Sequence, residues 1–433
     1  MLNGARRCNT RATTKANEKY ADASREQWVR QERTTPGTRR ADRSRGVPRS
    51  GSPRIRLAVL GVGSGSARDG ISRNGKGRWQ VTEPNGERGA EPVSTPARDA
   101  QLLERTVFEV KRVIVGQDRL VERILVGLLA KGHILLEGVP GVAKTLAVET
   151  FADVVGGSFS RLQFTPDLVP ADILGTRIYR QNSEHFDVEL GPVLANFVLT
   201  DEINRAPAKV QSALLEVMAE RHVSIGGHSF PMPSPFLVLA TQNPIENEGV
   251  YPLPEAQRDR FLFKLRVEYP SAEEEREIVY RMGVSAPQPQ PVLNPEELTR
   301  LQEVASKVFV HHALVDYVVR LSLATRTPAE HGLSDLAGWV SYGASPRASL
   351  GVVSAARALA LLRGRDYVIP QDVVDVVPDV LRHRLVLSYD ALADGVEVDH
   401  IIDRVLQTVP LPQVSARPQA ASAAGPVGAG PHQ

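Results

Sequence analysis

The chain has few of the residues that build disulfide frameworks or membrane spans. Its 433 residues include one cysteine, Cys8, so no disulfide can form within the chain, as is usual in a reducing compartment. It has no run of about 18 apolar residues, and its start has no apolar stretch of the signal-peptide kind. We therefore expect a cytoplasmic protein without membrane insertion.

Charge is unevenly distributed along the chain. Residues 1–100 hold 21 Lys and Arg against 10 Asp and Glu, although the whole chain has a net charge of only +2. Residues 1–97 are rich in Arg, Gly, Ser, Thr and Pro and have little apolar periodicity, so they cannot offset the entropy of ordering. We expect a disordered basic extension, or residues that precede the true start of the protein. A basic arm for nucleic acid or an acidic partner is the alternative, but interleaved aromatic residues are missing.

Between this extension and an Ala-, Pro- and Gly-rich tail at 412–433, short apolar runs alternate with helical patterns. Five runs predict buried strands: HILLE (133–137), RLQFT (161–165), NFVLT (196–200), FLVLA (236–240) and FLFKL (261–265). Helical stretches separate several of them, including 144–155 and 207–221, which favours a parallel α/β sheet with flanking helices. We expect this core to span 98–268.

The strand pattern stops near residue 271. Ser271 and Glu274 form a capping-box pattern, and further helices are predicted at 295–308, 312–326, 346–363 and 370–384. A smaller, all-α domain is therefore expected over 269–411.

The stretch LEGVPGVAKTL (136–146) connects the first predicted strand to a helix. A glycine-rich loop in this position presents backbone N–H groups and the positive end of a helix dipole to phosphate. Lys144 is expected to reach the β- and γ-phosphates and Thr145 to hold Mg²⁺. Ala143 occupies the position where the usual pattern has glycine. We expect helical backbone angles at Ala143, in which case no glycine is needed.

Two strands end in polar residues suited to hydrolysis. Asp201 and Glu202 follow an apolar strand. Asp201 is expected to bind Mg²⁺ through water, and Glu202 to polarise the attacking water. Asn243 ends the strand at 236–240 with an amide that can orient this water. Each motif alone is also typical of an ordinary turn, so the prediction depends on their combination with the phosphate loop.

Arginines provide candidates for stabilising charge on a transferred phosphoryl group. Arg260 precedes the last predicted strand and is a candidate for donation to a neighbouring subunit, with Arg258 as its competitor and a surface ion pair to Asp259 as the plain alternative. Arg347, after the predicted cap Ser345, is expected to reach back to the γ-phosphate or else to be an ordinary helix-surface residue. Gly116 and Gln117 are candidates for an adenine pocket.

In their order along the chain, these stretches resemble the MoxR-type AAA+ ATPases. The resemblance covers about 108–400 and rests on VIVGQD, LLEGVPGVAKT, FTPDLVPADILG, GPVLANFVLTDEINRAP, QSALLEVMAER, LATQNPIENEGVYPLPEAQRDRF and GASPRASL. The family's loop often has alanine before the lysine, so Ala143 is similar to a family variant.

The resemblance implies a five-stranded AAA+ core with a helical lid, assembled as a ring that is commonly hexameric, and ATP with Mg²⁺ as cofactors. It implies Walker B carboxylates at Asp201 and Glu202, sensor 1 at Asn243, an arginine finger at Arg260 and sensor 2 at Arg347. It assigns the Walker A loop to Gly138, Val139, Pro140, Gly141, Val142, Ala143, Lys144 and Thr145.

The family further implies insertions at 166–195 and 222–233 that face the pore or the client. It also implies a von Willebrand factor A-domain partner and chaperone-like maturation or metal insertion. A nucleic-acid motor is the main rival, but the stretch HVSIGGHSFPMP (222–233), expected to form a β-hairpin on Gly226–Gly227, has no Lys or Arg for phosphates. A nucleotide-gated scaffold with little turnover is a third reading, against which Glu202, Asn243 and Arg260 together argue.

Overall fold

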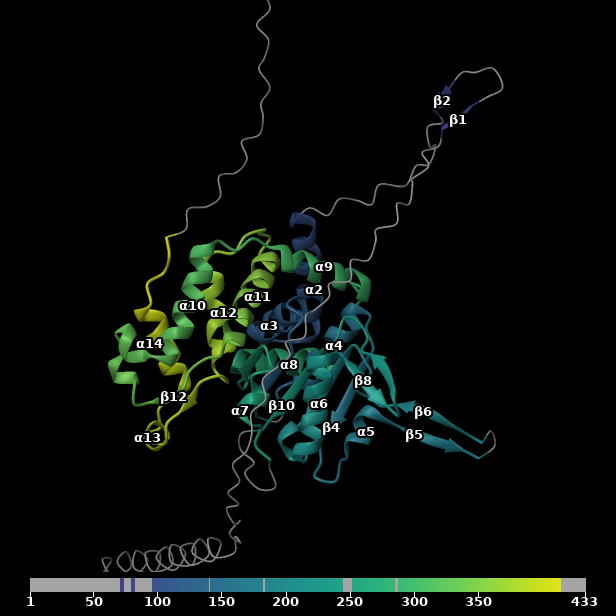
Figure 1. Cartoon of the computed structure of the whole chain (residues 1–433), viewed down its shortest axis with the longest axis horizontal. Coiled ribbons are helices and arrows are strands. Elements are labelled where there is room, and N and C mark those ends of the chain that lie inside the picture. The colour runs from purple at the N-terminus through teal and green to yellow at the C-terminus, as the bar shows by residue number, and fades with distance from the viewer. Residues whose placement is uncertain are drawn as a thin grey trace, which may run out of the picture. The chain divides into compact units, whose positions relative to one another are not determined.

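A five-stranded parallel sheet forms the core of the larger of two units in the computed structural model, the unit drawn with most of the helices in Figure 1. The described residues are 71–73, 79–81, 96–139, 141–181, 184–243, 251–284 and 287–413. The strand order is β11-β3-β10-β7-β4, with all neighbouring pairs parallel. The strands are β3 (Ile134–Gly138), β4 (Phe159–Gln163), β7 (Phe197–Asp201), β10 (Leu237–Gln242) and β11 (Phe263–Val267). All five predicted strands are therefore confirmed, with ends shifted by one or two residues.

Both faces of this sheet are covered, which explains why its strands are apolar without alternation. On one face, Leu136 and Leu199 pack against helices α2 (Pro96–Val113), α3 (Asp118–Leu129) and α4 (Lys144–Val155). On the other, Leu135 and Val198 pack against α5 (Pro170–Leu174) and α6 (Ala208–Glu220). A short helix, α7 (Glu255–Arg258), and the turn η1 (Ile203–Arg205) complete the core.

Two β-hairpins extend from the second face. The β8–β9 hairpin (His222–Ile225 and His228–Pro231) turns on Gly226 and Gly227, both with positive φ, as the sequence predicts. A second hairpin, β5–β6 (Gly175–Arg180 and His185–Leu190), lies within the predicted insertion and projects from the body (Figure 1). Its strands were not predicted, because exposure on both sides leaves them without an apolar periodicity.

Helices dominate the part that follows the sheet. They are α8 (Ala272–Val284), α9 (Pro295–Lys307), α10 (His312–Arg326), α11 (Pro346–Leu362), α12 (Pro370–Leu381), α13 (Tyr389–Ala393) and α14 (Val398–Thr408), with the turns η2 (Pro328–His331) and η3 (Ser334–Leu336). Ser271 and Glu274 exchange the two capping-box hydrogen bonds at the start of α8, as expected. The expectation of an all-α lid needs correction, because β12 (Val340–Tyr342) pairs antiparallel with β13 (Val386–Leu387). Strands of two or three residues are too short to produce a readable pattern.

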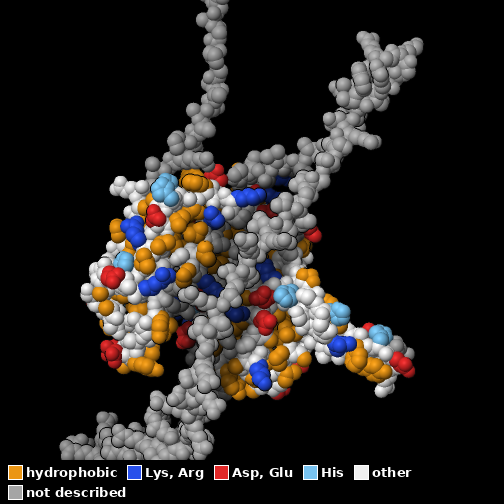
Figure 2. Space-filling view, viewed as in Figure 1, with side chains coloured by type: hydrophobic (Ala, Val, Ile, Leu, Met, Phe, Trp, Pro, Cys, Tyr) orange, Lys and Arg blue, Asp and Glu red, His pale blue; other side chains and the backbone are white. Residues whose placement is uncertain are grey.

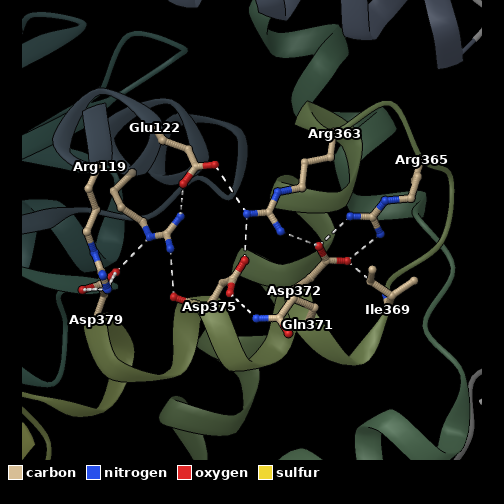
Figure 3. A network of polar contacts seen from close by, with 10 residues as sticks. Arg119, Glu122, Arg363, Arg365, Ile369, Gln371, Asp372, Asp375 and Asp379 are labelled. Carbon is tan, nitrogen blue, oxygen red and sulfur yellow. Dashed lines mark hydrogen bonds and ion pairs between the residues drawn. The ribbon is translucent and has the colours of Figure 1, made fainter. Parts of the chain in front are cut away.

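The lid shares a hydrophobic core with the first sheet face. One continuous apolar cluster runs from β3 and α3 to lid residues such as Leu301, Leu359 and Val380. A polar network reinforces the contact between α12 and α3 (Figure 3). In it, the buried Asp379 carboxylate accepts hydrogen bonds from Arg119 and Arg123 of α3.

The rest of the network ties α12 to the end of α11. Arg363 and Arg365 both donate to Asp372, whose side chain is fully buried, and Arg363 also contacts Asp375 (Figure 3). A buried carboxylate needs this degree of pairing to remain charged. The lid and the sheet are therefore joined by apolar packing and by ion pairs.

Most of the predicted extension, residues 1–97, lies outside the described residues, as does most of the tail at 412–433. Within the extension, β1 (Ile71–Arg73) and β2 (Trp79–Val81) pair antiparallel as a separate unit, and α2 begins at Pro96. Among the described residues, no helix combines the length and apolarity needed to cross a membrane.

Candidate nucleotide-binding site

A cavity of about 420 Å³ lies at the edge of the sheet where β3, β4, β7 and β10 end. This is where an open parallel sheet binds its ligands. The structure thus brings together the phosphate loop, both acidic residues and the asparagine, which are far apart in sequence. The lining residues are Gly141, Ala143, Lys144, Thr145, Leu146, Arg161, Gln163, Asp201, Glu202, Thr241 and Asn243.

Ala143 adopts a left-handed backbone conformation, with φ 56° and ψ 23°. The expectation of helical angles is therefore wrong. Ala143 is the N-cap of α4, and the chain turns left-handed there, as it does at Gly141 with φ 85°. Alanine pays about 1–2 kcal/mol for this conformation. Ala143 is exposed and lines the cavity, so backbone strain is the main cost of having alanine there.

Lys144, the first residue of α4, is half-buried in the cavity. Its Nζ donates to the carbonyl oxygen of Gly138 at 2.7 Å. Desolvation lowers the pKa of Lys144, and the nearby Asp201 and Glu202 carboxylates counteract this lowering. Gly138 itself has no room for a side chain, because a Cβ there would overlap the backbone of Val267 in β11.

The Asp201 side chain is 12 % exposed and has two partners that the sequence did not reveal. Arg161 of β4 donates to its Oδ2 from Nε at 2.7 Å, and the Thr241 hydroxyl donates to Oδ1 at 3.3 Å. Both partners lie on strands that flank β7, so sheet register brings them to Asp201. Arg161 could have been suggested as such a partner from the sequence, because it is a lone cation within the predicted strand run RLQF.

Glu202 also has a left-handed conformation, with φ 56°. Its backbone N–H donates to the Thr241 hydroxyl at 3.0 Å. Its Oε2 accepts from Gln163 Nε2 at 3.0 Å and pairs with Arg205 at 2.9 Å. The turn aims this carboxylate into the cavity beside Asp201, while Gln163 and Arg205 determine its orientation.

Arg260 and Arg347 do not reach the cavity of their own chain. Both lie near the start of β11, which pairs with the start of β3, whereas the phosphate loop follows the end of β3. These two ends are about 13 Å apart along the strand. Arg260 donates to the Leu215 carbonyl at 2.5 Å, and Arg347 lies 3.8 Å from Asp259. The expectation that Arg347 reaches back within its own chain is therefore not met.

The remaining candidates lie around the loop rather than in the cavity lining. Val142 is buried in the core and Val139 is half-buried, while Pro140 lies outside the described residues. Gln117 donates from Nε2 to the Glu268 carbonyl at 2.9 Å, just beyond the end of β11. Gly116 packs against Glu274. Gly116 and Gln117 therefore lie at the same sheet edge as the phosphate loop, beside the cavity and not in its lining.

Comparison with known proteins places this site in a family. Residues 133–263 match the ATPase family associated with various cellular activities (AAA), and residues 337–405 match the AAA lid domain. The chain is 73% identical over 331 residues to Chaperone MoxR1 of Mycobacterium tuberculosis, covering 76% of this chain and 88% of that one. It is 35% identical over 320 residues to Protein MoxR of Paracoccus denitrificans, covering 69% and 93%.

The chain belongs to the MoxR family of AAA+ ATPases. A crystal structure of a protein assigned as an ATPase from Cytophaga hutchinsonii is 45% identical, with a TM-score of 0.70, and covers 73% of this chain and 97% of that one. Membership of this family indicates a chaperone-like AAA+ protein with a nucleotide site.

The cavity of this MoxR-family protein fits a nucleotide with a magnesium ion. A hydroxyl and a carboxylate, from Thr145 and Asp201, face the same space and are oxygen donors of the kind that Mg²⁺ prefers. Two protein ligands suffice for Mg²⁺, which commonly keeps several waters and phosphate oxygens. The Lys144 ammonium group lines the same cavity, and it is a cation of the kind that phosphates bind.

Proposed function

We propose that this chain hydrolyses Mg-ATP and uses the energy to remodel a protein client. One observation supports this most directly: Lys144, Thr145, Asp201, Glu202 and Asn243 all line a single cavity. A nucleotide-gated scaffold would not need Glu202 there, because a second carboxylate beside Asp201 adds repulsion toward phosphate and becomes useful only for activating water.

Each residue has a chemical role in this proposal. The loop N–H groups and Lys144 would hold the phosphates, and Thr145 with Asp201 would hold the metal, which would neutralise charge on the phosphate oxygens. Glu202 polarises the attacking water, and Asn243 orients it. Gln163 and Thr241 position Glu202, since both are hydrogen-bonded to it.

We propose that Arg260 and Arg347 act on the nucleotide of a neighbouring copy. Both are exposed, and both lie at the sheet edge opposite the phosphate loop of their own chain. An assembly in which each copy presents this edge to the next copy's cavity is head-to-tail, and such contacts form a ring when the rotation between neighbours closes. We propose a ring of six copies, as the family resemblance implies.

The client side of the proposal rests on the projecting β5–β6 hairpin. Tyr179 and Phe186 form a cross-strand aromatic pair with ring centroids 5.1 Å apart, and both are about half exposed. Arg177 lies over the Phe186 ring at 4.6 Å and packs on Gly226 of the β8–β9 hairpin. Figure 2 shows hydrophobic side chains gathered along this projection. Such an exposed apolar patch is typical of a protein-binding surface.

The proposal has three further parts. Remodelling matures the client, which includes clients that receive a metal. A von Willebrand factor A-domain protein acts as partner, and the protein works in the cytoplasm. A nucleic-acid motor is less well supported. The β8–β9 hairpin, from His222 to Pro231, contains no Lys or Arg with which to follow a phosphate backbone.

Glu202→Gln tests the proposal. The variant should bind ATP and assemble like the wild type while hydrolysing it about 100-fold or more slowly, since the amide cannot act as a base. Thr408→Ala, on the exposed end of α14, serves as the control and should keep full turnover. Wild-type hydrolysis by Glu202→Gln would remove Glu202 from its role, and failure of the wild type to bind ATP would overturn the proposed function.

A further inference from the structure

Arg384, in the turn after α12, is a lid residue whose contacts the proposed mechanism has not used. Its side chain is only 4 % exposed. Nε donates to Asp259 Oδ1 at 2.7 Å, and Nη2 donates to the carbonyl oxygens of Asp259 at 3.2 Å and Phe261 at 2.6 Å. Nη1 donates to the Leu262 carbonyl at 3.1 Å and to that of Val380. All five N–H groups of the guanidinium therefore have acceptors.

These contacts bracket Arg260. Four of the five hydrogen bonds go to Asp259, Phe261 or Leu262, the residues on either side of Arg260. The buried Arg384 side chain thus fixes the backbone on both sides of Arg260, while Arg260 itself remains exposed. Lysine could not replace Arg384, because a single ammonium has three donors and no planar fork.

Asp259 extends the same arrangement to Arg347. Its Oδ2 accepts from the Ser345 hydroxyl at 2.9 Å and lies 3.8 Å from Arg347 Nη1. Ser345 is the N-cap of α11 and also accepts from the Arg347 backbone N–H. One carboxylate therefore links Arg384, the start of α11 and the loop that carries Arg260.

We propose that Arg384 is a positioning residue that, through Asp259, holds Arg260 and Arg347 as one rigid pair for the neighbouring subunit's nucleotide. This rests on the proposed function, in which those two arginines act between subunits. The physical reason is that phosphoryl transfer depends on placement: a misplacement of about 1 Å can cost about 100-fold in rate. In this proposal, the lid determines whether the loop that carries Arg260 can place this arginine in the nucleotide site of the neighbouring subunit.

A purely structural tie between lid and core is the competing explanation, and a nearby arginine provides a matched control. Arg382 is also largely buried in the same turn, but it donates to Asp399, Asp379 and the Lys264 carbonyl, and the structure gives it no bond to 259–262. Arg382→Gln should therefore destabilise the lid contact without displacing Arg260.

The first experiment separates binding from turnover. Arg384→Gln should lower the kcat for ATP about 10- to 100-fold while leaving ATP binding and KM within about twofold. Arg384→Lys should recover little, and Asp259→Asn, which preserves volume, should reproduce the loss. A kcat for Arg384→Gln no lower than that of Arg382→Gln would overturn the inference. If Arg384→Gln does not fold, Asp259→Asn takes its place, and a kcat for Asp259→Asn no lower than that of Arg382→Gln would overturn the inference.

The second experiment mixes subunits. Arg384→Gln subunits retain an intact cavity, and Glu202→Gln subunits retain intact arginines, so rings containing both should regain hydrolysis above the sum of the two separate activities. Arg260→Ala mixed with Glu202→Gln should do the same. Recovery with Arg260→Ala but not with Arg384→Gln would overturn the inference and leave the proposed function standing. Recovery with neither would refute action between subunits, and the inference with it.

Discussion

The Arg161 guanidinium donates to the Asp201 carboxylate at 2.7 Å from a neighbouring strand, inside the candidate nucleotide cavity. The residue proposed to hold the metal is therefore paired with a permanent cation of its own chain. The Arg161 side chain is 54 % exposed, so it has room to leave this partner. A cation beside Asp201 opposes Mg²⁺ and attracts phosphate.

Arg161→Ala should therefore weaken the binding of ATP without Mg²⁺ and strengthen the response of binding to Mg²⁺. With EDTA present, affinity for a fluorescent ATP analogue should fall about tenfold, because one charged hydrogen-bonding group for phosphate is lost. The Mg²⁺ concentration needed for half-maximal binding should fall as well, since Asp201 loses its competitor. Titrations of the analogue at fixed Mg²⁺ concentrations measure both quantities.

Arg404→Ala is the control for Arg161→Ala, because the Arg404 side chain is also exposed and forms an ion pair with a carboxylate, Asp335 in the lid, at 2.9 Å. It should change neither titration. General damage to the site by Arg161→Ala would weaken binding with and without Mg²⁺, and that result would contradict the prediction.

Ala143→Gly should stabilise the protein. Glycine removes the left-handed penalty of about 1–2 kcal/mol, against an entropic cost of about 0.5–1 kcal/mol. A gain of roughly 0.5–1 kcal/mol in the free energy of unfolding follows. Ala219→Gly, at an exposed helical position in α6, should lose a similar amount. Urea unfolding measures both, and a loss in Ala143→Gly would show that its left-handed conformation carries no strain.

Stability should fall in mild acid because of His133. Burial lowers the pKa of His133 from 6.5 to about 3. Its Nδ1 accepts from the Val238 N–H at 3.0 Å, which the protonated ring cannot do. The unfolded chain takes up a proton below its pKa of about 6.5 and the folded chain does not until about pH 3, so stability is full above 6.5 and declines as pH falls between these values.

The loss attributed to His133 is about 1–2 kcal/mol near pH 5.5 and grows toward pH 3. Chemical unfolding of wild type and His133→Gln between pH 7 and 5 should show a smaller decline in the variant, since glutamine does not titrate. Equal pH slopes would contradict the assignment to His133. His383, whose pKa burial also lowers, adds a background decline common to both proteins.

Asp379→Ala should destabilise the lid contact strongly. The carboxylate is 1 % exposed and pairs with Arg119, Arg123 and Arg382. Removing it leaves the buried Arg123 guanidinium with Glu122 as its remaining carboxylate partner, and breaking a buried pair in this way costs about 3–5 kcal/mol. Asp335→Ala breaks an exposed pair and should cost at most about 1 kcal/mol. Calorimetric melting would contradict the prediction if the two variants melted at similar temperatures.

The sequence by itself was enough to predict the five strands and their common edge. Apolar runs followed by Gly138, by Asp201 or by Asn243 are local signals, and parallel strands bring their carboxyl ends to one edge of the sheet. Part of the cavity lining was therefore readable without coordinates, namely Gly141, Ala143, Lys144, Thr145, Asp201, Glu202 and Asn243, whereas Leu146, Arg161, Gln163 and Thr241 were not.

Tertiary structure alone decided the partners of those residues. Arg161 reaches Asp201 because β4 pairs with β7 in a register that places Gln163 opposite Asp201. Arg384 reaches Asp259 across 125 positions of sequence. The left-handed angle of Ala143 was not readable from residue type, since alanine by itself favours a helix. Residue type and spacing identify groups that can perform the chemistry, but long-range packing determines which charges face them.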